Sequence, residues 1–220
     1  CSLLPDIPNN EGMYRPITVT APENTIVNPK YPAAVVARSN TGHYLPALVH
    51  AALQNVIPDR IMAATGSPLW IFTITGLRND GSTFANVLFY NGGMGAPSTK
   101  DGVSAMSYPS NISSTPVEIC ESNGPLFCHH KKLRPGSGGA GTYRGGLGQD
   151  IMFECTSETP ILAMFMTERV RFGAPGLAGG QDGEPGAVLI NGEPVDVHKQ
   201  HPLNKGDTVL LRTPGGGGLG

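Results

Sequence analysis

The stretch from Pro135 to Gly148 concentrates glycine around one arginine, Arg144, and is the first candidate for binding chemistry. Glycines allow successive backbone N–H groups to point into one concavity, and an arginine adds charge, so the stretch could hold an anion. It is not a P-loop, because Thr142 and Tyr143 stand where the phosphate-contacting Lys and its Ser or Thr would follow. The alternative is a crowded crossing of backbones, which only glycine can fill.

Histidines are the next candidates, for acid–base or metal chemistry. His43 precedes a predicted helix and could face a cleft as a catalytic base, whereas His50, on the flank of that helix, reads as a polar edge residue. His198 and His201 flank a turn beside acidic residues, a set that could hold a divalent ion, but H-x-x-H outside a helix is nonspecific. We predict no metal site in this sequence.

Lys100 and Asp101 place opposite charges in a predicted loop beside several serines. The alternative there is an ordinary turn. The sequence does not favour nucleophilic catalysis by a serine. The G-x-S-x-G motif of serine hydrolases is missing, because Ser104 and Ser137 each lack one flanking glycine.

Composition limits the classes of partner. Fifteen basic and 17 acidic residues in 220 give a net charge of −2, and without an arginine-rich arm nucleic acid is excluded. No apolar run reaches the roughly 18 residues of a membrane span, since Gly66, Pro68 and Gly76 interrupt the best one. Charged residues are only 15%, so we expect partner surfaces, with self-association or large exposed apolar patches in the isolated chain.

The N-terminus lacks an initiator Met, a basic segment and a cleavage site. It reads as a cut inside something longer. We expect a cytoplasmic chain whose cysteines are reduced and mostly buried.

The residues that could do chemistry must be positioned mainly by short strands. Apolar, β-branched runs predict strands at 17–20, 69–75, 86–90, 151–155, 161–166, 187–190 and 208–212. Asn191-Gly192 between two such runs predicts a type I′ hairpin. The apolar residues Leu45, Leu48, Val49, Ala52, Leu53 and Val56 follow helical spacing, and Pro58 ends that helix.

These elements predict an α+β, mainly β fold, with several short strands in packed sheets, glycine-rich loops and one clear amphipathic helix. A division into a mixed α/β part, 1–125, and a β-rich part, 126–220, is one way to organise it.

Several motifs, taken in order, resemble the hydantoinase B/oxoprolinase family. They include Asn91-Gly-Gly-Met-Gly-Ala96, Lys100-Asp-Gly-Val-Ser-Ala105, Tyr108-Pro-Ser-Asn111, Thr115-Pro-Val-Glu-Ile119, the stretch Leu133 to Gly148, and Thr213 to Gly218. A further segment, Leu4 to Gly12, is similar to the opening of that family's C-terminal half. The chain thus resembles the C-terminal portion of an N-methylhydantoinase B-like subunit.

The resemblance implies an ATP-dependent hydrolase of cyclic amides: hydantoins, 5-oxoproline or lactams. An ATP-binding A subunit would phosphorylate the amide oxygen, and the B subunit would deliver a metal-activated water. The implied partners are that A subunit, the missing N-terminal half of the same B-type polypeptide and the cyclic-amide substrate. The implied ATP and divalent metal would be held outside these residues, so the fragment alone would be inactive.

The candidate residues of a substrate cleft or subunit interface are Asn91, Gly92, Gly93, Lys100, Asp101, Arg144, Gly145, Gly146 and His43. Catalytic residues are not assigned. The other interpretations are a stand-alone β-rich binding or scaffold module without catalysis, and a subunit of an enzyme like the related acetone carboxylases.

Overall fold

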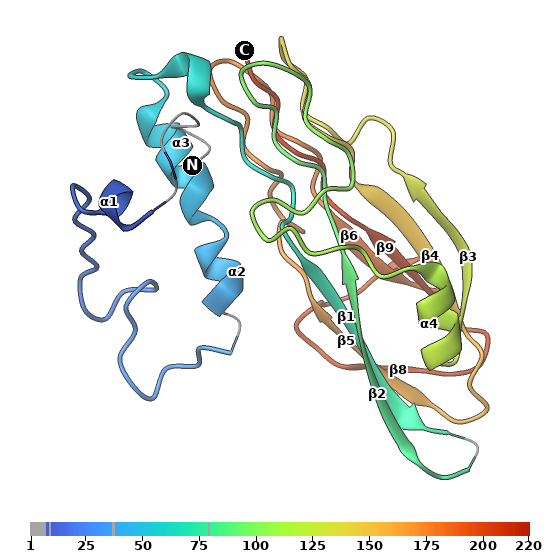
Figure 1. Cartoon of the computed structure of the whole chain (residues 1–220). Coiled ribbons are helices and arrows are strands. Elements are labelled where there is room, and N and C mark those ends of the chain that lie inside the picture. Colours follow the sequence, from blue (N-terminus) through green and yellow to red (C-terminus); the bar gives the residue numbers. More distant parts are fainter. Residues whose placement is uncertain (1–7, 9, 37, 79) are drawn as a thin grey trace.

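Short apolar, β-branched runs form two antiparallel sheets in the computed structural model, which describes residues 8, 10–36, 38–78 and 80–220. One sheet has the order β2-β1-β5-β8 and comprises β1 (Trp70–Leu77), β2 (Thr83–Tyr90), β5 (Ile161–Met166) and β8 (His201–Leu203). The other has the order β3-β4-β9-β6-β7 and comprises β3 (Leu126–Leu133), β4 (Gln149–Cys155), β6 (Ala187–Ile190), β7 (Glu193–Pro194) and β9 (Thr208–Arg212). The mainly β prediction is confirmed (Figure 1).

The two sheets share one apolar core. Phe72 of β1 stacks on Phe165 of β5 with ring centroids 5.2 Å apart, and lies 6.1 Å from the ring of Phe153 in the other sheet. Burying aromatic rings in contact contributes more than their area alone. Strands from both sides of residue 125 join in the first sheet, so the suggested division at that point runs through it.

The predicted hairpin is confirmed. Asn191 and Gly192 have φ values of 52° and 84°, as both central residues of a type I′ turn require. The Asn191 side chain also bonds the neighbouring turn, donating from Nδ2 to Asp207 Oδ1 at 2.8 Å and accepting from Thr208 N at 2.8 Å.

One predicted strand is absent from the described structure, and two observed strands were not predicted. Residues 17–20 form no strand: the segment is irregular and Val19 is 85% exposed, so no sheet offers it a partner. Conversely, β3 and β8 were not predicted. β3 is an edge strand whose His and Lys side chains interrupt the apolar run that signals a strand, and its register shifts between Cys128 and His130.

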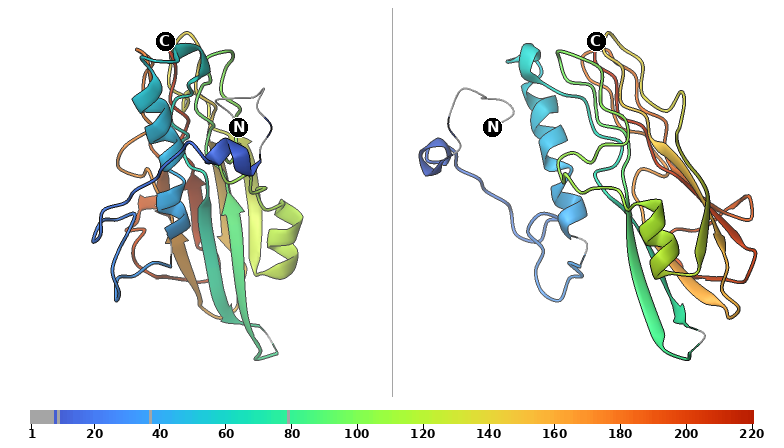
Figure 2. Two further views of the ribbon diagram at one scale, coloured as in Figure 1. Left: turned by 60° about the vertical axis from the view of Figure 1, so that its left-hand side comes forward. Right: turned by 45° about the vertical axis from the view of Figure 1, so that its right-hand side comes forward.

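The described helices are short: α1 (Glu11–Tyr14), α2 (Arg38–Gly42), α3 (Leu45–Leu53), the 3₁₀ turn η1 (Pro58–Arg60) and α4 (Val117–Asn123). In Figures 1 and 2, α1 to α3 lie on one side of the sandwich, and α4 lies beside β3. None of these helices is long and apolar enough to cross a membrane.

Helix α3 confirms the predicted helix but orients it unexpectedly. Leu48 is 63% exposed and Val56, just beyond the helix, 72% exposed, whereas His50 is buried. The prediction that His50 is a polar edge residue was therefore wrong. The apolar stripe seen in the sequence faces away from the sandwich and the imidazole faces inward.

Candidate functional site

Glycine-rich segments that are far apart in the sequence lie side by side beyond one end of the sandwich. In Figure 1 they are the irregular segments, drawn as thin tubes, that extend beyond the sheets near the C-terminus. The array comprises residues 62–67, 91–96, 101–105, 136–148, 173–184 and 213–220. It therefore brings together three glycine-rich stretches that lie far apart in the sequence, 91–95, 136–148 and 215–218.

The C-terminal segment lies at the centre of this array. Gly215 N donates to Glu184 O at 3.1 Å, Gly216 N to Gly146 O at 2.9 Å and Gly217 N to Ala64 O at 2.9 Å, while Gly217 O accepts from Ala96 N at 3.0 Å. A strand in a sheet has neighbours on two sides only, whereas this segment bonds at least four others. The array is thus a bundle of extended chains rather than another sheet.

Close packing of backbones explains the glycines. A Cβ atom on Gly145 would overlap the carbonyl oxygen of Gly216, and one on Gly93 would overlap that of Gly146. The crowded crossing is therefore what the structure contains. Gly145 N and Gly146 N donate to the carbonyl oxygens of Gly139 and Met94, at 2.9 and 2.8 Å, so neither N–H is directed at an anion.

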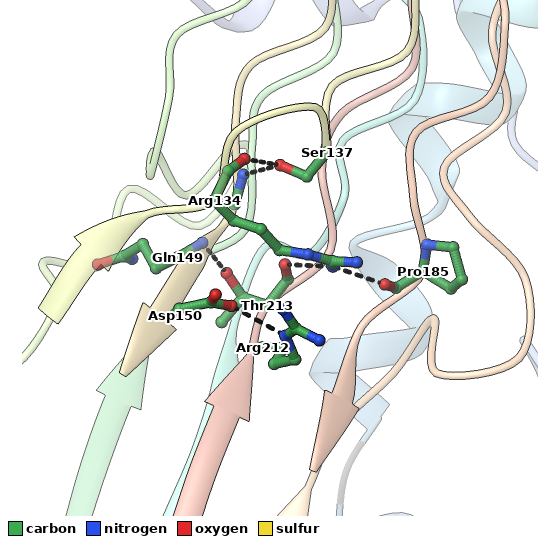
Figure 3. A network of polar contacts seen from close by, with 8 residues as sticks. Arg134, Ser137, Gln149, Asp150, Pro185, Arg212 and Thr213 are labelled. Atoms are coloured by element: carbon green, nitrogen blue, oxygen red, sulfur yellow. Dashed lines mark hydrogen bonds and ion pairs between the residues drawn. The ribbon is translucent and has the colours of Figure 1, made fainter. Parts of the chain in front are cut away.

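A polar network joins the array to the ends of β3, β4 and β9 (Figure 3). Arg134 Nη1 donates to Pro185 O at 2.7 Å and to Thr213 O at 3.4 Å, and Ser137 Oγ donates to Arg134 O at 2.7 Å. Gln149 N donates to Thr213 Oγ1 at 2.7 Å. These bonds satisfy buried polar groups at the point where regular strands end.

Asn91 belongs to this junction. Its carbonyl oxygen accepts from Gln149 Nε2 and from Thr213 Oγ1, both at 2.9 Å, and its Nδ2 donates to Ile112 O at 3.1 Å. Asn91, Gly92 and Gly93 are all buried. These three candidate residues therefore lie inside the array, where they position backbone.

Asp101 and Arg144 meet at the edge of the array. Asp101 Oδ1 accepts from the backbone N of Arg144 at 2.9 Å, and Gly102 N returns a bond to Arg144 O at 2.8 Å. The two side chains are 3.9 Å apart and about half exposed, a geometry that contributes little to stability. The Arg144 guanidinium is consequently available at the surface beside Gly145 and Gly146.

Lys100 lines a pocket of about 430 Å³. Helix α3 contributes His50 to this pocket, and segments 58–62 and 94–100 form the other walls, with Tyr108. His50 is 4% exposed, and its Nδ1 is buried with no hydrogen-bond partner among the described residues. Burial lowers the pKa of His50 below its usual 6.5, which makes the neutral imidazole the form present near pH 7.

His43 lies in a separate and much smaller hollow, of about 10 Å³, which has room for roughly one water molecule. Its Nδ1 is buried without a partner among the described residues, and burial lowers the pKa of the ring. Met62 and Tyr108 line both hollows. His43 and Lys100 therefore lie in two different hollows, which share Met62 and Tyr108 as lining residues.

Sequence reasoning missed a half-buried polar cluster that joins the helical segment to the end of β5. Glu168 accepts hydrogen bonds from the Tyr44 hydroxyl and, at 3.1 Å, from Ser67 Oγ, while the Arg169 guanidinium lies 4.9 Å from the centre of the Tyr44 ring. Burial raises the pKa of Glu168, and burial together with Glu168 raises that of Tyr44 to about 12. Trp70 Nε1 donates to Glu168 O at 3.0 Å.

A signal for this cluster was present in the sequence. Glu168 and Arg169 follow the apolar strand 161–166 after one residue, Thr167, and precede a further glycine-rich stretch, 173–186. Charged residues at the end of an apolar strand are candidates for a site, because loops at strand ends carry function.

The described residues do not fit a metal ion. No group of three or more His, Cys, Asp or Glu side chains in this part of the chain is arranged to hold one. His201 Nε2 lies 2.8 Å from the backbone oxygen of Asp196, and Asp196 Oδ1 accepts from His198 N at 3.0 Å, so these groups stabilise a turn.

Comparisons with known proteins agree with the arrangement of these motifs. A family model described as hydantoinase B/oxoprolinase matches residues 1–220. An uncharacterised protein of Methanocaldococcus jannaschii is 34% identical over 98% of this chain and 38% of its own length. The B subunit of a putative D-/L-hydantoinase from a Pseudomonas species is 29% identical over 98% of this chain and 37% of its own length.

A solved structure shows the same fold. The crystal structure of an ATP-dependent caprolactamase from Pseudomonas jessenii matches all of this chain and 41% of its own with a TM-score of 0.83 and 24% identity. The chain therefore spans well under half the length of these relatives. Because the family match runs from the first residue to the last, the chain belongs to the hydantoinase B/oxoprolinase family.

Proposed function

We propose that the chain is part of the B-type subunit of an ATP-dependent enzyme that opens cyclic amides such as hydantoins, 5-oxoproline or lactams. Family membership supports this, since the relatives include the B subunit of a putative hydantoinase and an ATP-dependent caprolactamase. The observation that carries the proposal is the array: segments 91–96, 101–105, 136–148 and 213–218, which carry the family resemblance, interlock in one body next to the pocket of Lys100.

The chemistry explains the need for ATP. Transfer of a phosphoryl group to the amide oxygen converts a poor electrophile into a reactive one. Water adds at that carbon, the ring C–N bond breaks with nitrogen leaving as an amine, and a second water hydrolyses the resulting acyl phosphate. A lactam or 5-oxoproline gives the open-chain amino acid, and a hydantoin, whose leaving nitrogen belongs to a urea group, gives the N-carbamoyl amino acid; ADP and phosphate are released in each case.

This chain contributes a rigid wall and a docking surface. The N–H groups of Gly145 and Gly146 are already bonded, so the array is unsuited to cradle ATP, which we assign to an A-type partner subunit. The divalent metal of the complete enzyme is assigned to the rest of the B-type polypeptide. The exposed apolar residues of α3, including Leu48, are where we place contacts with those parts. We place the assembly in the cytoplasm.

The test uses the complete enzyme, with this chain in its full-length polypeptide and the A-type partner present. Hydantoin, 5-oxoproline and caprolactam are each incubated with ATP, and ADP release and ring-opened product are measured together. The proposal predicts that at least one ring opens in strict dependence on ATP. Product without ATP consumption would contradict it.

Two other outcomes identify the alternatives. ATP-dependent carboxylation of a ketone with bicarbonate, without ring opening, would place the protein with the acetone carboxylases. Assembly of the complex without turnover of any of these substrates would favour a scaffold.

A further inference from the structure

The pocket that contains Lys100 has a rigid floor. Ala63 N donates to Ala96 O at 2.9 Å and Ser98 N donates to Ile61 O at 3.1 Å, so residues 61–63 and 96–98 are paired. Ala96 N continues this pairing into the array by donating to Gly217 O at 3.0 Å. A site built on interlocked backbone keeps its shape when a ligand enters, which limits the entropic cost of binding.

The wall of the Lys100 pocket has an apolar face and, apart from it, a few polar groups. Ile61 and Met62 are 2% and 7% exposed and, with Met94, form an apolar face. His50, on α3, presents a buried imidazole whose Nδ1 has no hydrogen-bond partner among the described residues. A mostly apolar pocket with a few fixed polar groups is typical of a small-molecule site.

The charges of the wall do not cancel. Arg60 and Asp59 form an ion pair of 3.8 Å and so offset each other. Lys100 is exposed and its ammonium has no hydrogen-bond partner within the part of the chain that the structure describes. One positive charge therefore remains at the pocket, which favours a ligand with a negative group.

We propose that this pocket binds a cyclic amide that carries an anionic group, with the anion on Lys100, the ring on Ile61, Met62 and Met94, and the amide toward His50. The proposal rests on the proposed function for the reaction class, and adds where the substrate lies and which substrates are preferred. A neutral imidazole has one N–H and one lone pair, so it can pair with either the carbonyl or the N–H of an amide.

A matched pair of substrates tests the proposal in the complete enzyme. 5-Oxoproline and 2-pyrrolidinone have the same five-membered lactam ring, but only the first carries a carboxylate. Lys100→Gln should raise KM for 5-oxoproline by about tenfold or more, because a charge-assisted bond is lost, and leave KM for 2-pyrrolidinone within about twofold. Lys132→Gln, an exposed lysine on the edge strand β3, is the charge-matched control and should change neither value.

His50→Leu provides a second, independent readout. It should raise KM for both rings by about fivefold or more while the melting temperature stays equal or rises, because a buried nitrogen without a partner is removed. A lowered melting temperature with unchanged KM would assign His50 to packing and overturn its role in binding.

Failure of this proposal and failure of the proposed function give different results. Ring opening that responds equally to Lys100→Gln for both substrates, or not at all, overturns the pocket assignment and leaves the reaction intact. If neither ring is opened, saturation-transfer NMR of 5-oxoproline with the protein still tests the site. Binding that Lys100→Gln abolishes supports it, and no binding overturns it.

Discussion

The carbonyl oxygen of Gly146 occupies the position where a side chain on Gly93 would begin. The two residues belong to segments separated by about fifty positions in the chain, and the bond from Gly146 N to Met94 O, 2.8 Å long, holds them together. Backbone-to-backbone contact of this kind cannot be relieved by rotating a side chain. The array is therefore sensitive to the smallest possible substitution.

Gly93→Ala should lower the free energy of unfolding by ~3 kcal/mol or more, because two backbones must separate to admit a methyl group. Urea denaturation followed by Trp70 fluorescence measures this. Gly42→Ala is the matched control, since a Cβ there meets nothing within 4 Å. Equal stability of both variants would show that the array can expand, contrary to the close packing described above.

Asp101→Ala should cost ~1 kcal/mol, because it leaves the backbone N–H of Arg144 without its side-chain acceptor. Asp101→Asn keeps an acceptor oxygen and should restore most of the loss. If Asn is as damaging as Ala, the carboxylate charge matters more than the hydrogen bond to Arg144.

Arg144→Ala should reduce ATP-dependent ring opening by the complete enzyme about tenfold while shifting the melting temperature by less than ~2 °C. The guanidinium is half exposed, and its nearest atom lies as far as 3.9 Å from the Asp101 carboxylate, so this ion pair contributes little to stability. Steady-state kinetics and calorimetry give the two quantities. An unchanged rate with a lower melting temperature would return Arg144 to a structural role.

Glu168→Gln should make the protein relatively more stable as pH rises. Burial raises the pKa of Glu168 above its ordinary 4.5, so the stability it contributes is fully present below that value and is lost as pH rises through the folded pKa. Gln stays neutral throughout. The difference in free energy of unfolding between variant and wild type should grow from about pH 4 to about pH 7. A difference that shrinks over this range would mean that the ionised form is the one stabilised, by Arg169.

Leu48→Gln with Val56→Gln should reduce self-association and hydrophobic-dye binding of the isolated chain, since the two side chains are 63% and 72% exposed. Stability should change by less than ~0.5 kcal/mol, because neither side chain is buried. Sedimentation velocity measures the association. Val87→Thr, at a half-exposed position on β2, is the control and should leave association unchanged. If all variants self-associate to the same extent as the wild type, the surface responsible for self-association lies elsewhere.

Local patterns predicted much of the fold. The turn at Asn191-Gly192 follows from the need for positive φ at both residues. Most strands were found because short apolar, β-branched runs between turn residues are typical of strands that pack in a core. β3 escaped because an edge strand tolerates the His and Lys side chains that a central strand excludes. Helix α3 was predicted from the helical spacing of its apolar residues, but that spacing does not determine which side of the helix faces the sandwich.

The candidate site divides in the same way. Residue types and their order identified the glycine segments, Lys100, Asp101 and Arg144, because glycine spacing and charge are visible one residue at a time. Three features depend on contacts between distant parts of the chain: which segments cross, that His50 rather than His43 lines the pocket of Lys100, and that half-buried Glu168 bonds Ser67. The sequence by itself determined where backbone could approach backbone. Only the tertiary structure decided which backbone does so, since a glycine permits close contact without selecting its partner.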